Sequence, residues 1–296
     1  MDINYELYKV FYYVANTLSF SEASKQLYIS QSAVSQSIKA LEKKIGQTLF
    51  IRSTKKVMLT PEGEILLRHV EPAINLIQRG ESQIMEAATT GGQIRIGASD
   101  TICRYFLVPY LEQFHKEFPN AHIKVTNGTS IQCAELLSSG QVDLILTNYP
   151  NTYLSNLVTV KPIKEFHDVF VANDTFKELE GKTHTLKELL NYPILMLDTR
   201  STTSEFLHAL FQKHQLDLVP EIELSSNDLL IDLARIGLGI AFIPDYCLNK
   251  RQEDLFIVET EEALPTRQLA LAYNTNFPIS KVTKEFISYL EEGKLS

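Results

Sequence analysis

The chain has 296 residues, a hydrophobic content of 44% and a formal net charge of −8, which are ordinary values for a globular protein. Its length predicts about two domains and a core that needs no disulfide or metal to hold it. No apolar run approaches the roughly 20 residues of a membrane-spanning helix, and MDINYELYK lacks the basic and apolar regions of a secretory signal. Three widely spaced cysteines show no disulfide or metal-ligand pattern. We therefore expect a cytoplasmic protein that contacts no membrane and carries no metal or cofactor.

Charge is distributed unevenly along the chain. Residues 1–60 contain 8 Lys and Arg against 4 Asp and Glu, whereas the remainder contains 20 against 32. The overall charge argues against a general nucleic-acid binder, but neutralisation of phosphates depends on local charge. Any contact with DNA is therefore expected in residues 1–60, while the acidic remainder should resist wrapping onto DNA.

The first predicted helix covers Tyr5–Thr17. Its apolar residues follow helical spacing and predict a stripe that faces a core, which Phe20 should join. The stripe consists of Leu7, Val10, Phe11, Val14 and Leu18. Three tyrosines of the same segment, Tyr8, Tyr12 and Tyr13, either pack the domain or reach DNA, and we expect packing.

Two further helices are predicted at about residues 21–27 and 31–45, with a tight turn between them. Ser30 occupies the N-cap position of the second helix, where its hydroxyl can accept a hydrogen bond from a backbone N–H. One face of this helix is apolar and comprises Ala33, Val34, Ile38, Leu41 and Ile45. The other face carries hydrogen-bonding side chains, Gln31, Ser32, Ser35, Gln36 and Lys39. Such side chains read base edges in a major groove about 12 Å wide, so we expect these five residues and Ser21 to contact DNA.

A two-stranded hairpin is predicted after Gly46, which is typical of a helix C-cap. The segment LFIRSTKKVMLT alternates as two strands do, with its turn at residues 53–56. We expect Arg52, Lys55 and Lys56 to contact phosphates, which would position the domain without reading sequence. The alternative is an ordinary solvated basic turn.

These segments together resemble one protein family. SFSEAS, ISQSAVSQSIKALEKKIGQTLFIR and LTPEG are similar to the winged helix-turn-helix of LysR-type transcriptional regulators. Ser24 stands where the family usually has a second alanine, and Ser32 stands where it usually has proline. Neither departure alters the helical register. The resemblance implies that residues 1–60 form a domain that binds double-stranded promoter DNA.

A long helix is predicted from Pro61, with Thr60 as its cap, to about Ala88. Its apolar residues follow a 4-3 step over three repeats, which makes a heptad seam despite the unusual Pro72. The seam consists of Leu66, Val70, Ala73, Ile77, Gly80, Ile84 and Ala87. The helix either packs on its own chain or pairs two subunits. We expect a homodimer through residues 61–90, because two recognition helices can then read two half-sites, and the resemblance implies a linker helix and a homotetramer.

After a predicted hinge at Thr89–Gly92, residues 91–296 alternate between strands and helices. The first set covers residues 94–98, 104–118, 123–126, 131–139 and 142–147; its βαβαβ order predicts a parallel sheet with right-handed crossovers. The second set has strands at 169–172, 194–197, 222 and 239–243, and helices at 203–213 and 228–236. A return strand at 268–273 and a last helix at 282–290 follow. GQVDLIL and GLGIAFIPD match two more elements of the LysR-type pattern, which implies a two-lobed α/β effector domain akin to periplasmic binding proteins.

Hydroxyl and amide side chains follow five of the predicted strands. Ligands of open α/β sheets bind beyond the carboxyl ends of the strands, and helices that start there favour anions. We therefore expect a small anionic effector, a co-inducer, at Ser99, Thr101, Thr129, Ser130, Thr147, Asn148, Thr202, Thr203 and Ser225. Asp100 and Arg200 would tune charge selectivity or simply lie on the surface. Simple N-capping is the alternative role for each hydroxyl.

Enzymatic functions are not indicated. The sequence contains no Gly-x-Ser-x-Gly elbow, Walker loop or His-Glu-x-x-His motif, and its seven histidines are scattered. We expect a transcriptional regulator that is controlled by a small molecule, and the resemblance implies altered contact with RNA polymerase. Two alternatives stay open: a redox sensor that uses Cys103 and Cys133, and a solute-binding protein without a DNA role, which would leave the basic N-terminal part unexplained.

Overall fold

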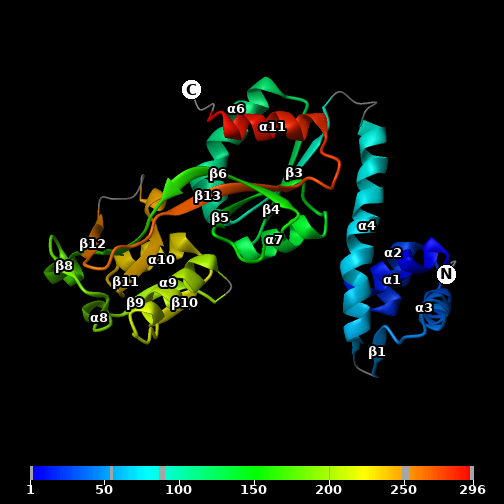
Figure 1. Ribbon diagram of the computed structural model, residues 1–296, viewed down its shortest axis with the longest axis horizontal. Coiled ribbons are helices and arrows are strands. Elements are labelled where there is room, and N and C mark those ends of the chain that lie inside the picture. Colours follow the sequence, from blue (N-terminus) through cyan, green and yellow to red (C-terminus); the bar gives the residue numbers. More distant parts are fainter. Residues whose placement is uncertain (1–2, 54–55, 87–90, 200, 249–253, 294–296) are drawn as a thin grey trace. The chain divides into compact units, whose positions relative to one another are not determined.

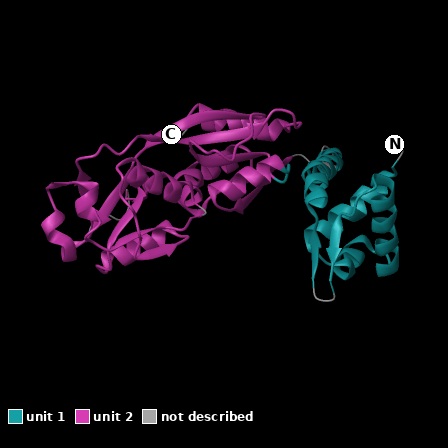
Figure 2. Ribbon diagram, turned by 60° about the horizontal axis from the view of Figure 1, so that its bottom comes forward, with its two compact units in different colours: residues 1–85, 139–141 teal, residues 86–138, 142–296 magenta. Residues whose placement is uncertain are grey.

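The computed structural model describes residues 3–53, 56–86, 91–199, 201–248 and 254–293. The chain divides into two compact units (Figure 2). The first comprises Met1–Met85 with Ser139–Gln141, and the second comprises Glu86–Ser138 with Val142–Ser296. Each unit has its own core, so each is described separately.

The first unit contains three short helices, a two-stranded hairpin and one long helix (Figure 1). These elements are α1 (Tyr5–Thr17), α2 (Phe20–Leu27), α3 (Gln31–Ile45), β1 (Phe50–Arg52), β2 (Val57–Leu59) and α4 (Pro61–Glu86). Fully buried side chains from each of the three short helices form the core, among them Phe11, Ala23, Val34, Ile38 and Leu41. Tyr8, Tyr12 and Tyr13 pack against this core, as predicted.

The start of α4 is fixed by Thr60. Its hydroxyl accepts a hydrogen bond from the Gly63 N–H at 3.0 Å and donates one to the Thr48 carbonyl at 2.8 Å. A Cβ on Gly63 would collide with the backbone carbonyl oxygen of Leu49. The LTPEG segment therefore combines a helix cap with a close approach of backbone that only glycine permits.

The predicted seam of α4 is not free along its whole length. Val70 is buried in the core of the first unit, and Leu66 packs against that core. The expectation that this helix has nothing in its own chain to cover was therefore wrong for its first half. Further along, Ala73 is exposed, Ile77 is 59% exposed and Ile84 is 77% exposed. Ala87 lies outside the described residues, and Pro72 lies within the helix without ending it.

The first lobe of the second unit is built on a five-stranded sheet in the order β4-β3-β5-β13-β6. Its strands are β3 (Gln93–Ala98), β4 (His122–Asn127), β5 (Leu144–Tyr149), β6 (Val158–Phe166) and β13 (Arg267–Asn274). β3 pairs in parallel with β4 and β5, as the βαβαβ pattern predicts, but β13 pairs antiparallel with β5 and β6. The sheet is therefore mixed rather than wholly parallel.

Helices cover this sheet. They are α5 (Asp100–Ile102), the π-helical segment η1 (Cys103–Leu107), α6 (Val108–Glu117), α7 (Ser130–Ser138) and α11 (Lys281–Glu291). The helix predicted at 104–118 thus begins four residues earlier and contains a π-helical turn. This earlier start brings Asp100 and Thr101 into the first turn directly after β3.

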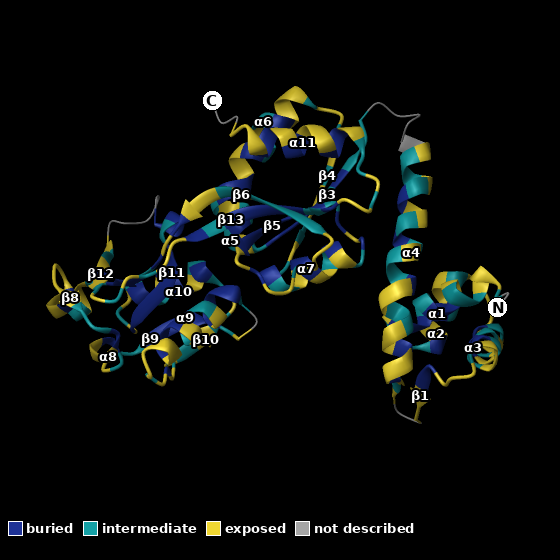
Figure 3. Ribbon diagram, in the orientation of Figure 1, coloured by how far each residue is buried: buried dark blue, intermediate teal, exposed yellow. Residues whose placement is uncertain are grey.

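The second lobe has a six-stranded sheet in the order β10-β9-β11-β7-β12-β8. Its strands are β7 (Asp168–Ala172), β8 (Thr183–His184), β9 (Ile194–Leu197), β10 (Ile222–Leu224), β11 (Ile240–Pro244) and β12 (Phe256–Thr260). Its helices are η2 (Asp174–Leu179), α8 (Leu186–Leu189), α9 (Thr202–Lys213), α10 (Asn227–Arg235) and η3 (Asp245–Cys247). The strands of both sheets are largely buried, whereas exposed residues gather on the helices and turns (Figure 3).

The chain passes between the two lobes twice. It leaves the first sheet at Phe166, the last residue of β6, and enters the second at Asp168, the first residue of β7. It returns after β12 to begin β13 at Arg267, which pairs with Phe166. These crossings confirm the predicted two-lobed α/β architecture and place both connections side by side.

Candidate DNA-binding surface and effector cavity

The two faces of α3 differ as the sequence predicts. Val34, Ile38 and Leu41 are fully buried, while the opposite side carries Gln31, Ser32, Gln36 and Lys39 as exposed residues and Ser35 as a half-buried one. Ser30 caps the helix, since its Oγ accepts a hydrogen bond from the Ala33 N–H at 3.2 Å. The hydroxyl of Ser32 lies 2.9 Å from that of Ser30. The exposed face is thus presented by a helix whose first turn is already satisfied within the chain.

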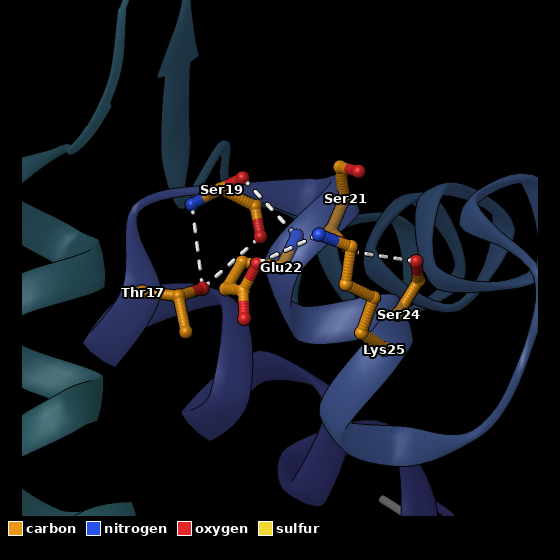
Figure 4. A network of polar contacts seen from close by, with 6 residues as sticks. All are labelled: Thr17, Ser19, Ser21, Glu22, Ser24 and Lys25. Atoms are coloured by element: carbon orange, nitrogen blue, oxygen red, sulfur yellow. Dashed lines mark hydrogen bonds and ion pairs between the residues drawn. The ribbon is translucent and has the colours of Figure 1, made fainter.

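Local contacts also fix the start of α2 (Figure 4). The Ser19 Oγ accepts a hydrogen bond from the Glu22 N–H at 3.2 Å, and Glu22 pairs with Lys25 at 3.3 Å. The Ser24 hydroxyl donates to the Ser21 carbonyl at 2.8 Å. Among the described residues, none of these contacts uses the Ser21 hydroxyl, which is exposed and available to a partner.

Arg52 is held by the protein itself. Its guanidinium lies 3.6 Å from the Glu42 carboxylate, donates to the Ser35 Oγ at 3.3 Å and stacks over the Phe20 ring at 4.5 Å. Glu42 in turn accepts hydrogen bonds from the Leu49 and Phe50 N–H groups at 2.9 and 3.3 Å. Arg52 and Glu42 therefore join the recognition helix to the hairpin, a role that the sequence reading missed and that leaves a phosphate contact by Arg52 as a prediction.

The hairpin turn is only partly described. Ser53 and Lys56 close it, because the Ser53 N–H donates to the Lys56 carbonyl at 2.9 Å and the Lys56 N–H donates to the Ser53 Oγ at 3.0 Å. Lys56 is exposed, as a phosphate contact requires. The predicted contact Lys55 lies outside the described residues.

A cavity of about 270 Å³ lies between the two lobes of the second unit. Seven predicted effector residues line it: Ser99, Thr101, Thr129, Ser130, Asn148, Thr203 and Ser225. The strand ends from which they were predicted therefore do converge. Asp100 also lines the cavity, whereas Arg200 lies outside the described residues.

Four helices begin at the wall of this cavity. Their N-caps are hydroxyls: Ser99 accepts from the Ile102 N–H, Thr129 from the Gln132 N–H, Ser201 from the Thr203 N–H and Ser226 from the Leu229 N–H. All four capping residues line the cavity. Because a helix N-terminus carries a partial positive charge and unpaired N–H groups, four of them on one cavity favour an anion.

Two predicted effector residues face elsewhere. The Thr147 Oγ1 accepts from the Asn151 side chain at 3.0 Å and donates to the Asn148 carbonyl at 3.3 Å. The Thr202 Oγ1 accepts from Arg267 at 3.2 Å. Neither residue is part of the cavity wall, so the strand-end rule identified the right segments but not the orientation of these two side chains.

Several lining residues were not predicted. Asn127, Gln132, Asp198 and Tyr246 stand out because they bring amide, carboxylate and phenol groups to the wall. Tyr246 follows β11, and the strand-end rule applied to that strand would have found it. Its side chain is 6% exposed, and burial holds the pKa of its phenol well above the ordinary 10.0, so the group stays a proton donor. The Tyr246 Oη and the Oδ1 atoms of Asn148 and Asn227 are buried without a hydrogen-bond partner among the described residues.

Direct contacts join the lobes at the rims of the cavity. The Asn227 side chain donates to the Thr101 Oγ1 at 2.9 Å. Asp228 accepts the Tyr105 phenol at 2.6 Å and pairs with Arg104 at 3.1 Å. Tyr153 donates to Glu205 at 2.8 Å. The lobes are therefore held together in this arrangement by side chains from both sides, which limits the cavity to a compact ligand.

The two cysteines near the cavity are protected. The Cys103 thiol donates to the Asn127 Oδ1 at 3.4 Å, and the Cys133 thiol donates to the Gly128 carbonyl at 3.5 Å. Burial raises the pKa of Cys103 to about 11 and that of Cys133 to about 12. A reactive cysteine needs a lowered pKa, so this geometry does not favour the redox alternative. Among the described residues no group of His, Cys, Asp and Glu could hold a metal ion, and no helix there is long and apolar enough to cross a membrane.

Two known families match nearly the whole chain between them. Residues 5–64 match the bacterial regulatory helix-turn-helix proteins of the lysR family, and residues 87–294 match the LysR substrate binding domain. A probable RuBisCO transcriptional regulator of Synechocystis sp. is 28% identical over 281 residues, covering 93% of this chain and 81% of that protein. The transcriptional regulator CysB of Burkholderia cenocepacia is 28% identical over 242 residues, covering 81% and 77%. The matched proteins are transcriptional regulators rather than enzymes.

Solved structures share the fold. CbnR complexed with its target DNA superposes with a TM-score of 0.67 at 17% identity, covering 98% of this chain and 99% of that one. Full-length OxyR from Pseudomonas aeruginosa gives 0.68 at 20% identity, covering 99% and 94%. The regulatory domain of Synechocystis CcmR in complex with 2-PG gives 0.62 at 21% identity, covering 68% of this chain and 97% of that one. At these identities the similarity establishes the architecture alone.

Proposed function

Because the chain belongs to the LysR family of DNA-binding transcriptional regulators, we propose that the exposed face of α3 reads promoter DNA under the control of a small anionic effector in the interlobe cavity. Residues 1–60 would form the DNA-binding domain, 61–90 the linker and dimerisation helix, and 91–296 the effector domain. The helix-turn-helix match argues against a solute-binding protein without a DNA role.

For the DNA contact, the support is the separation of the two faces of α3. Gln31, Ser32, Ser35, Gln36 and Lys39 present the amide, hydroxyl and ammonium groups that pair with base edges and phosphates. Ser21, Lys56 and Lys55 would contribute to the backbone contacts, and Arg52 would serve mainly to brace α3 against the hairpin. We expect a homodimer through α4 and a homotetramer to act on the promoter, with the effector changing contact with RNA polymerase in the cytoplasm.

For the effector, the convergence of four helix N-termini carries the proposal. No Lys, Arg or His occurs among the described lining residues, so the positive potential comes from helix ends and neutral donors such as Tyr246. The wall also contains two carboxylates, Asp100 and Asp198. A ligand of low negative charge that also carries hydrogen-bond donors fits this wall better than a multiply charged anion does.

A ligand-binding screen tests the effector site. We would measure thermal unfolding of the full chain with small carboxylates, amino-acid precursors, sulfate and phosphate, and then confirm each stabilising compound by calorimetry. Ser225→Tyr places a bulky side chain on the cavity wall without removing a helix cap, and it should abolish binding of that compound while sparing DNA binding. Val219→Tyr, at a 77% exposed position outside the cavity wall, is the matched control. Undiminished binding to the Ser225 variant would reject the cavity as the effector site.

A further inference from the structure

Tyr28 is the most exposed large side chain of the described residues, at 94%. It lies in the turn between α2 and α3, two residues before the Ser30 N-cap. Neither its ring nor its phenol has a contact within the described part of the first unit, in contrast to the core-packed Tyr8, Tyr12 and Tyr13. A large aromatic side chain is therefore held in solvent beside the recognition helix.

The backbone of Tyr28 adds to the cost of this placement. Its φ of 55° and ψ of 37° lie in the left-handed region, which glycine and asparagine tolerate better than an aromatic residue does. The turn imposes this conformation, because the Tyr28 N–H donates to the Lys25 carbonyl at 3.2 Å and the Ile29 N–H donates to the Ser24 carbonyl at 3.1 Å. Stability alone would therefore place a different residue here.

The position of Tyr28 indicates what it contacts. The first residues of a recognition helix meet base edges in the major groove, so the turn that precedes them lies beside the sugar-phosphate backbone at the groove edge. The exposed residues Ser21, Gln31 and Ser32 flank the turn and belong to the DNA-facing surface proposed above. Tyrosine hydroxyls are common donors to phosphate oxygens.

We propose that Tyr28 is a DNA-backbone contact, with its phenol donating to a phosphate oxygen and its ring packing against the adjoining deoxyribose. This inference rests on the DNA-binding function of the family and adds a residue to its interface. Because the contact reads no base, its loss weakens binding to every sequence alike. Because the phenol carries no charge, its loss leaves the salt dependence of binding unchanged, unlike the loss of a lysine.

The test compares full-length variants on two fluorescent duplexes, one from a footprinted upstream region and one of mixed sequence. Tyr28→Asn should raise the melting temperature, since it relieves the left-handed strain, yet lower affinity about tenfold on both duplexes. Tyr28→Phe keeps the ring and backbone and should lower affinity about threefold on both. The slope of affinity against salt should match that of the unaltered protein for both variants.

Leu18→Asn is the matched control, because Leu18 also adopts a left-handed conformation, at φ 47°, in the turn before α2. It should raise the melting temperature without changing either affinity. Unaltered DNA binding by both Tyr28 variants would overturn the proposal, and so would a loss confined to the specific duplex, which would indicate base reading. Should the unaltered protein itself bind neither duplex, the DNA-binding function would fail rather than the Tyr28 contact alone.

Discussion

Most hydroxyls around the effector cavity serve two purposes. Ser99 and Thr129 cap helices through bonds of 3.3 and 3.2 Å while they line the cavity. Capping and ligand binding were posed as alternatives in the sequence, but here the first enables the second, because a cap fixes the helix start whose free N–H groups face the ligand. The orientation of Thr147 and Thr202 depended on Asn151 and Arg267, which are distant in sequence or unrelated to any strand-end pattern.

The cysteines allow a prediction at the same scale. A thiol reacts as its thiolate, and at pH values below 9 a pKa of about 11 leaves roughly one hundredth of the thiolate that a pKa of 9.0 gives. Cys103 in the folded protein should therefore react with iodoacetamide about 100-fold more slowly than it does in denaturing urea, where burial is lost. Mass spectrometry of the digested protein after timed labelling measures each cysteine separately. Fast labelling of folded Cys103 would revive the redox alternative.

At the scale of elements, α4 carries the prediction for assembly. Its first half is used by the core of the first unit, so only the later seam residues remain for a partner. Ile77 and Ile84 are one heptad apart and 59% and 77% exposed, which is unusual for isoleucine. Replacing both with Asp should convert the oligomer to a smaller species in light scattering, because two buried charges would then oppose each other across the seam.

The matched control for this variant is Gln78→Asp, which adds a charge at an exposed polar position of the same helix outside the seam. It should leave the molar mass unchanged, and circular dichroism should show equal helix content in all variants. An unaltered mass for the isoleucine variant would place the subunit contact elsewhere on the protein.

Elements with strong periodicity were predictable to within a few residues, and α1 and α3 match their predicted bounds. The strands β6, β8 and β12 were missed for identifiable reasons. β6 contains Pro162, which argues against a central strand, but β6 is the edge of its sheet and the register shifts beside Pro162 where it pairs with Leu269 and Ala270. β8 has only two residues and pairs with β12 at the opposite edge of the second sheet, so neither carries a buried pattern on its own.

At the scale of the whole effector domain, the two chain crossings meet at one buried ion pair. The Arg267 guanidinium lies 2.6 Å from the Asp168 carboxylate, and the two side chains are 2% and 0% exposed. Arg267 also donates to the hydroxyls of Thr203 and Thr202 at 3.0 and 3.2 Å and lies 5.0 Å from the centre of the Phe206 ring. A side chain at the start of β13 thus sets the first turn of α9, which lines the cavity through Thr203.

This pair should be costly to break and cheap to replace as a whole. Arg267→Met leaves Asp168 buried without its cation and should lower the free energy of unfolding by about 3–5 kcal/mol, whereas Arg267→Met with Asp168→Leu should lose considerably less. The pKa of Asp168 is already raised, mainly by its burial, so its protonated form is favoured in the folded state. Stability from such a group is present at low pH and is lost as pH rises through the folded pKa. The melting temperature of the single variant should consequently fall more steeply than that of the unaltered protein between about pH 5 and pH 8.

Thermal unfolding followed by circular dichroism measures both effects, and a pair on the surface of the same domain provides the comparison. Lys161 and Glu291 also approach to 2.6 Å, but their side chains are 41% and 33% exposed. Water solvates the charge left by Lys161→Met, so that variant should lose no more than about 1 kcal/mol and show the pH dependence of the unaltered protein. If Arg267→Met were equally mild, the crossings would not depend on the ion pair, and α9 would owe its position at the cavity to packing around Phe206 alone.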